Sequence, residues 1–205
     1  MPPEKTKDKL LNAAVSVFAE KSYSEATVAE ICERAEANIS AVNYHFGSKE
    51  KLLRHALRHA FQMAESEHPL GGDLKPGATP EARLFAYLNA MIRRSFDPGS
   101  AGLFERIMSR EGTREVHGNI TFDEVSQLQG KYLTQILNEL LVNPDAHLLQ
   151  QARLNLIALC VFPNLAPQLV NLLFPKKPTE SELVTYIEHQ FQFARRGLAV
   201  LKSSI

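Results

Sequence analysis

Apolar side chains recur at helical spacing along nearly the whole chain. In the first segment, Leu11, Ala14, Val15 and Phe18 are three or four residues apart, as on the buried face of a helix. No segment alternates apolar and polar residues for long enough to indicate a strand. The pattern therefore predicts an all-α fold of about nine or ten helices.

Capping residues and prolines indicate where these helices begin and end. Three Thr–Glu pairs have the spacing of a capping box, in which the glutamate reaches back to the N–H of the threonine. They are Thr27–Glu30, Thr121–Glu124 and Thr179–Glu182. Thr79-Pro80-Glu81 predicts another helix start, and Pro163 is expected to kink or interrupt a helix that ends before Phe174. The Pro- and Gly-rich run at residues 69–80 predicts a loop between an N-terminal and a C-terminal unit.

Residues 27–49 have the pattern of a helix-turn-helix. A short helix that begins at Thr27 is followed by a three-residue break at residues 36–38 and by a third helix from Ile39 to His45. Val42 and Phe46 are spaced to face the core, which leaves the other side of the third helix turned outward.

The outward side carries the chemistry expected of a reader of the DNA major groove. Asn43 can bond both N6 and N7 of adenine, and the small side chains before it let the backbone approach base edges. Nearby hydroxyl, imidazole and ammonium donors, with the free N–H groups of helix N-termini, suit phosphate oxygens. Taken singly, each of these residues is also typical of a packed or solvated helix. The predicted DNA-binding residues are Thr27, Ser40, Ala41, Asn43, Tyr44, His45 and Lys49.

Residues 6–53 resemble the DNA-binding domain of the TetR/AcrR family of bacterial regulators. The resemblance is carried by Phe18-Ala19, Tyr23, Thr27-Val28, Ile31-Cys32, Tyr44-His45-Phe46 and Lys49. Three residues depart from the family's pattern: Glu36 stands where a turn glycine is usual, Cys32 where an alanine is usual, and Asn43 where an aromatic is common. The segment Ile107–Thr113 and the last two helices resemble the CecR-like branch.

The family resemblance implies a homodimer that binds double-stranded operator DNA and responds to a small-molecule effector. It implies a helix-turn-helix domain over residues 1–50 and a helical ligand-binding and dimerisation domain over residues 51–205. The middle helices mix apolar and polar side chains, and in the family this region encloses a ligand. An ordinary core with a charged face explains any one of these residues equally well. The predicted ligand-binding residues are Phe85, Met91, Phe104, Met108, Arg110 and Phe122.

The last predicted helix, over about residues 179–201, is apolar on two sides. One stripe includes Leu183, Ile187 and Leu198, and the chain's own core can cover it. A second copy of the chain is the natural cover for the other stripe, although a helix buried within one chain would have the same pattern. The predicted dimerisation residues are Tyr186, Phe193, Gly197 and Val200, of which the glycine allows close helix approach.

Composition narrows the remaining possibilities. The net charge is zero, and residues 1–60 carry nine basic against eight acidic residues, so DNA binding must depend on where charges lie. Cys32 and Cys160 are expected to be buried thiols, and His55 and His59 lack a third metal ligand. No nucleophile–base set or phosphate loop indicates an enzyme, a cofactor or a metal. No signal peptide or long apolar run is evident, which predicts a cytoplasmic protein with no membrane partner.

These observations predict a DNA-binding transcriptional repressor that a small-molecule ligand releases from its operator. Two alternatives remain open. One is an activator, or a regulator without a small ligand. The other is a helical binding protein or enzyme that keeps the helix-turn-helix as a scaffold.

Overall fold

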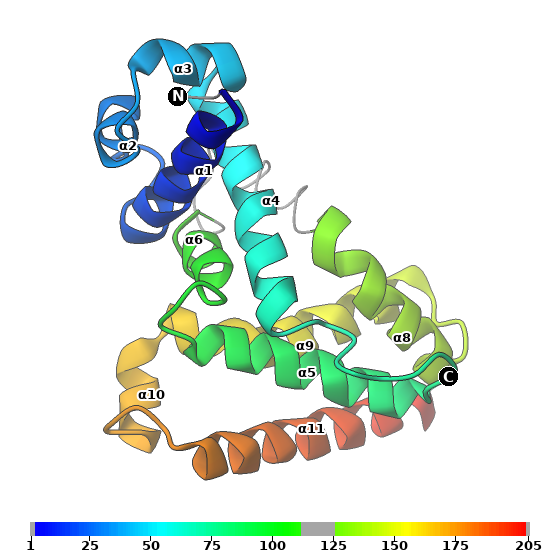
Figure 1. The fold of residues 1–205 in the computed structure, drawn as a ribbon. Helices are drawn as coiled ribbons and strands as arrows, with labels where there is room; N and C mark the ends of the chain where they lie inside the picture. The colour runs from blue at the N-terminus through cyan, green and yellow to red at the C-terminus, as the bar shows by residue number, and fades with distance from the viewer. Residues whose placement is uncertain (1–2, 112–125, 204–205) are drawn as a thin grey trace. The chain divides into compact units, whose positions relative to one another are not determined.

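The computed structural model describes residues 3–111 and 126–203, and within these ranges helices joined by loops are the only regular secondary structure (Figure 1). Ten α-helices lie there: α1 Pro3–Glu20, α2 Val28–Arg34, α3 Ile39–His45, α4 Lys49–Glu67, α5 Pro80–Phe96, α6 Leu103–Glu111, α8 Lys131–Leu141, α9 Ala146–Leu165, α10 Pro167–Leu173 and α11 Glu180–Ser203. A short π-helical turn, Ser126–Gly130, precedes α8. The predicted all-α fold is confirmed.

The described helices form two compact units. The first combines residues 1–67 with residues 98–128, and the second combines residues 68–97 with residues 129–205. This grouping follows packing, because α4 and α6 both pack on α1. The functional boundary expected at residue 50 is a separate matter and stays a prediction.

Helix α1 is the centre of the first unit. It packs against α2, α3, α4 and α6, and Leu10, Val17 and Phe18 on its inner side are fully buried. Helices α4 and α6 also contact each other, with the rings of Phe61 and Phe104 edge to face at 5.5 Å between centroids. Helix α1 therefore contacts both the helix-turn-helix and α6.

Helix α5 has the central place in the second unit. It packs against α8, α9 and α11, and α11 runs antiparallel beside it (Figure 1). Tyr87 and Met91 are buried on α5, as is Arg94, whose Nε donates to the carbonyl of His68 at 3.0 Å. Burial of a guanidinium requires such acceptors, so Arg94 joins the start of the α4–α5 loop to α5.

The predicted caps are present at the helix starts that the structure describes. The hydroxyls of Thr27, Thr79 and Thr179 each accept the backbone N–H three residues later. Glu182 completes the capping box of α11, because its carboxylate accepts the backbone N–H of Thr179 at 2.8 Å. Thr121–Glu124 lies outside the described residues.

Two expectations about helix boundaries differ in detail from the structure. The Glu30 carboxylate does not reach back to Thr27 but accepts from Lys21 at 2.8 Å, because the ammonium lies close by. The helix that Pro163 was expected to kink or interrupt is broken before Phe174, with a bend of 90°, but the break comes after α9 ends at Leu165 and not at Pro163 itself. The break comes at Ala166, which precedes Pro167 and is therefore disfavoured in the helical conformation.

The turn between α2 and α3 contains a residue in the left-handed region. Glu36 has φ +52°, although it carries a Cβ. Its carboxylate is exposed and accepts from Lys9 at 2.8 Å, and this ammonium lowers the pKa of Glu36. A left-handed conformation costs an L-residue free energy that glycine does not lose.

We expect Glu36→Gly to unfold at higher urea concentration than Glu36→Ala. Neither variant can pair with Lys9, so their difference isolates the backbone conformation. Glycine should be the more stable by about 0.5–1 kcal/mol, after subtraction of its larger entropy in the unfolded chain. Equal midpoints for the two variants at one protein concentration would contradict the strained turn.

Candidate nucleic-acid interface

The recognition helix of the motif, α3, is short and is anchored by few side chains. Val42 and Phe46 are buried, as the spacing predicts. The rings of Phe46 and His55 also meet edge to face, with 5.5 Å between their centroids. At the start of α3 the Asn38 side chain accepts the backbone N–H of Ser40 at 3.1 Å. The sequence analysis missed this cap, although asparagine is a preferred residue at that position.

The opposite side of α3 faces solvent. Ser40 and Asn43 are exposed, Ala41 and His45 are partly exposed, and Tyr44 is 82% exposed. The rings of Tyr44 and His45 meet edge to face at 4.9 Å. Five of the seven predicted DNA-binding residues therefore share one accessible side of α3, and Thr27 caps the neighbouring helix α2.

Lys49, the seventh of these residues, is engaged within the protein. Its Nζ donates to the carbonyl of Tyr23 and lies 4.2 Å from the centroid of the Tyr23 ring. Burial lowers the pKa of Lys49, against the opposing effect of Glu111. The backbone N–H of Tyr23 donates to the buried carboxylate of Glu111 at 2.6 Å. Local sequence patterns carry no signal for this contact, because its partners are 88 positions apart in the chain.

Four other cations near the motif are paired with acids. Lys9 contacts Glu36 and Lys21 contacts Glu30, each at 2.8 Å. Arg34 binds Glu20 through two hydrogen bonds of 2.7 and 2.9 Å, which lower the pKa of that carboxyl. Arg54 is 3.6 Å from Glu50.

Three lysines of the first unit remain available to an external anion. Lys5 and Lys7 at the start of α1 and Lys51 in the first turn of α4 are exposed, and none has an ion pair within the described ranges. Lys51 lies over the α3–α4 corner, where its Nζ is 3.9 Å from the position of a Cβ added to Gly47. These lysines are better placed than their paired neighbours to meet phosphates.

The predicted ligand-binding residues are distributed over both units. In the first unit Phe104 is buried against Phe61, Met108 is partly buried, and the Nε of Arg110 donates to the carbonyl of Ala19 at 2.8 Å. In the second unit Met91 is buried and Phe85 is partly exposed beside Phe191. Phe122 lies outside the described residues.

Three of the four predicted dimerisation residues lie on one exposed side of α11. Phe193 and Val200 are 64% and 65% exposed, and a Cβ added to Gly197 would meet no atom within 4 Å. Tyr186 is partly buried between the rings of Phe96 and Phe174. Helix α9, which contacts α11, also exposes Leu154 and Phe162.

The structure bears on two further kinds of site. Among the described residues, no three His, Cys, Asp or Glu side chains lie together as a metal site would require. Cys32 and Cys160 are both buried, as predicted, and burial raises the pKa of the Cys32 thiol.

No single described helix has the length and apolar content to cross a membrane. Helices α9 and α10 have that length and apolar content only when they are taken together, and they are bent by 90° at their junction.

Comparison with known proteins identifies the N-terminal motif. Residues 10–56 match the model of the bacterial regulatory proteins of the tetR family. The probable HTH-type transcriptional regulator YttP of Bacillus subtilis is 25% identical over 191 residues, which cover 85% of this chain and 84% of YttP. The HTH-type transcriptional repressor NicS of Pseudomonas putida is 36% identical over 67 residues, about a third of each chain (31% and 32%).

Solved structures share the whole fold. A TetR-like transcriptional regulator from Rhodococcus sp. RHA1 superposes with a TM-score of 0.66 at 18% identity, over 97% of this chain and 98% of the other. FadR from Bacillus subtilis, in complex with stearoyl-CoA, gives a TM-score of 0.69 at 17% identity, over 93% and 98%. The family match falls on the helices that present Asn43 and Tyr44 to solvent. Residues 10–56 are therefore a helix-turn-helix of the tetR family of bacterial regulatory proteins, and the chain as a whole is similar to transcriptional regulators that contain this motif.

Proposed function

We propose that this regulator is a repressor that binds its operator as a homodimer and is released by a small-molecule effector. The observation that carries the DNA-binding part is the exposed side of α3, held outward by buried Val42 and Phe46. TetR-family proteins bind operator DNA and small effectors, and NicS is named a repressor. Assignment to the CecR-like branch stays a proposal that rests on residues 107–113 and the last helices.

The proposed DNA contacts divide by role. Asn43 reads a base edge, and Ser40 and Ala41 allow the approach of α3. Tyr44, His45 and the N-terminus of α2 at Thr27 position the phosphates. Lys49 has two further N–H groups beyond the one given to Tyr23, so it can add a phosphate contact.

We expect Asn43→Ala to weaken binding to the cognate operator by about 1–3 kcal/mol while leaving binding to random DNA nearly unchanged. The reason is that only the cognate site offers the amide its two matched base atoms. Fluorescence anisotropy with both duplexes at one salt concentration measures the two affinities. An equal loss on both duplexes would refute base reading by Asn43.

Lys51→Ala is the matched control for this measurement, because Lys51 is also exposed at the motif. It should weaken both duplexes alike and make the plot of log K against log salt shallower by about 0.9 for each phosphate that the lysine neutralises. Lys49→Ala is a poorer control, since it also frees the carbonyl of Tyr23.

The proposed dimer uses the exposed apolar sides of α9 and α11. Phe193 and Val200 on α11 and Leu154 on α9 would be costly to leave in water, and each gains about 1.5–3 kcal/mol when buried. A two-fold axis brings the same surface of a second copy against them. The open side at Gly197 supports close packing of the two α11 helices.

Phe193→Asp should convert the dimer to monomers at micromolar concentration and abolish operator binding, because the charge would be desolvated in the interface. Sedimentation velocity measures the change. Gln192→Asp places the same charge about 100° away around the helix and should remain dimeric. A wild-type protein that sediments as a monomer would remove the basis of this proposal.

The effector is proposed to contact the residues that the sequence analysis predicts for it, Phe85, Met91, Phe104, Met108, Arg110 and Phe122. Helix α6 supports this role, because its last turn contacts the end of α1 through Arg110 and the α1–α2 loop through Glu111. A ligand that binds a DNA-incompetent conformer about a hundredfold better supplies roughly 2.7 kcal/mol at saturation, enough for release.

Release is tested by challenging the operator complex with apolar and amphiphilic metabolites, beginning with stearoyl-CoA, the ligand in the FadR structure. We expect one of them to dissociate the complex, and Met108→Trp to raise the concentration needed by about tenfold. Operator affinity without effector should stay nearly the same in this variant. An operator complex that none of the compounds dissociates would contradict ligand release.

A further inference from the structure

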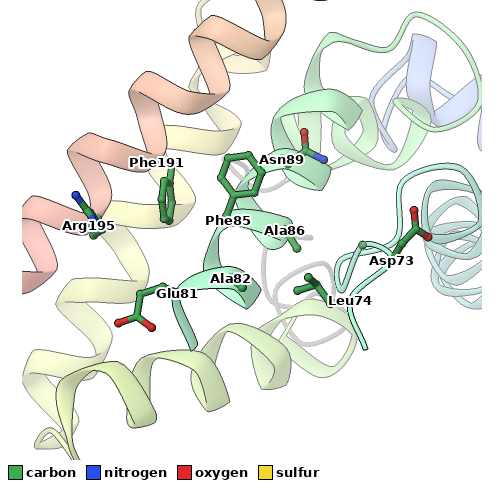
Figure 2. Close-up of a pocket in the computed structure, with 10 residues that line it drawn as sticks. Asp73, Leu74, Glu81, Ala82, Phe85, Ala86, Asn89, Phe191 and Arg195 are labelled. Atoms are coloured by element: carbon green, nitrogen blue, oxygen red, sulfur yellow. The ribbon is translucent and has the colours of Figure 1, made fainter. Parts of the chain in front are cut away.

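A groove lies beside α5 in the second unit. Aromatic and acidic side chains line it, and the proposed repression gives them no role. Its volume is about 520 Å³, within the range of small-molecule sites. Figure 2 shows Phe85 of α5 and Phe191 of α11 next to each other on one side of it, with Asp73 and Leu74 of the α4–α5 loop across α5 from them.

Small residues shape the floor of the groove. Gly72 has φ +55°, and a Cβ added to it would lie 3.3 Å from the Cβ of Ala86. The loop can therefore come close to α5 only because both positions are small. Ala82, one turn earlier on α5, leaves further space beside Phe85.

Aromatic surface faces this space. Phe85 is 37% exposed although it is a large apolar side chain, and its ring meets that of Phe191 edge to face at 5.2 Å. The face of an aromatic ring carries partial negative charge, so exposed rings favour a cation in a hollow.

The charged groups of the groove point to the same class of ligand. Asp73 and Glu81 line it, and neither has a hydrogen bond or ion pair among the described residues. Glu81 also lies in the first turn of α5, where a carboxylate complements the helix dipole, but Asp73 is in a loop and has no such role. The one cation of the lining, Arg195, donates to Gln192 at 3.1 Å. The lining of the groove therefore carries two acidic side chains against one basic side chain, and it includes two aromatic rings.

From this juxtaposition we infer that the groove binds an organic monocation, an ammonium that carries an aromatic or apolar group. The rings receive the apolar group and the ammonium, and the two carboxylates balance its charge. The buried stripe of Ile187, Ala194 and Leu198 separates the groove from exposed Phe193, so the dimer proposed above leaves it open. The site is independent of operator binding.

The test uses full-length protein without DNA, titrated with benzyltrimethylammonium and followed by backbone amide shifts in ¹⁵N–¹H spectra. We expect saturable shifts at the amides of Asp73, Glu81 and Phe191. Benzyl alcohol should bind about three- to fivefold more weakly, because it keeps the ring and lacks the charge. Phenylacetate should bind more weakly still, since the carboxylates repel it.

Two variants and one control decide the assignment. Phe85→Leu should weaken the cation about three- to fivefold, and Glu81→Gln about two- to fivefold. Glu188→Gln removes an exposed carboxylate of α11 outside the groove lining and should have no effect. Spectra that are unchanged elsewhere show that each variant is folded.

Three results would overturn the inference. They are the absence of saturable shifts at these amides, equal or tighter binding of phenylacetate, and wild-type affinity in both Phe85→Leu and Glu81→Gln. None of them would affect operator binding by α3, so this test and the test of the proposed function fail separately.

Discussion

The burial of Val42 and Phe46 against the core of the first unit is the interaction on which the proposed DNA-binding surface depends. Helix α3 has only seven residues, far too few to be stable alone in water. Val42 is the buried residue within it and Phe46 ends it. Because these two side chains are buried, the helical repeat places Ser40, Asn43 and Tyr44 on the side of α3 that faces solvent. Recognition chemistry thus follows from packing that never touches DNA.

Charge has a smaller part in this arrangement than in a basic DNA-binding domain. Lys9, Lys21 and Arg34 are each turned toward an acid of the same unit. These exposed pairs contribute little to stability, yet they lower the positive potential around the motif. Fewer phosphate contacts mean weaker binding to arbitrary DNA. In the proposed operator complex, discrimination between DNA sequences then rests on the outward face of α3 and on the spacing of the two α3 helices of the dimer.

Much of this could be predicted from the sequence, because caps, turns and stripes are local. Thr79-Pro80 and the Thr179–Glu182 box mark helix starts that the structure reproduces. The predicted contact of the Glu30 carboxylate with Thr27 is absent, because the ammonium of Lys21 binds that carboxylate instead. The contacts of Lys49 and Tyr23 could not be foreseen, since Glu111 reaches them from a distant part of the chain. The groove beside Phe85 was equally hidden, because three separate segments form it.

Tyr23 shows how a change in the body of the regulator can reach its DNA-binding surface. Its N–H is held by Glu111 of α6, and its carbonyl and ring are held by Lys49 of α4. Arg110 binds the end of α1 four residues before Tyr23. Three helices therefore meet at the loop that leads into α2. A ligand that favours another position of α6 must either break these hydrogen bonds or move the loop with them. Because Glu111 is buried, breaking its bond with Tyr23 would remove a hydrogen-bond donor from a carboxylate that is closed off from solvent, so movement of the loop is the less costly response.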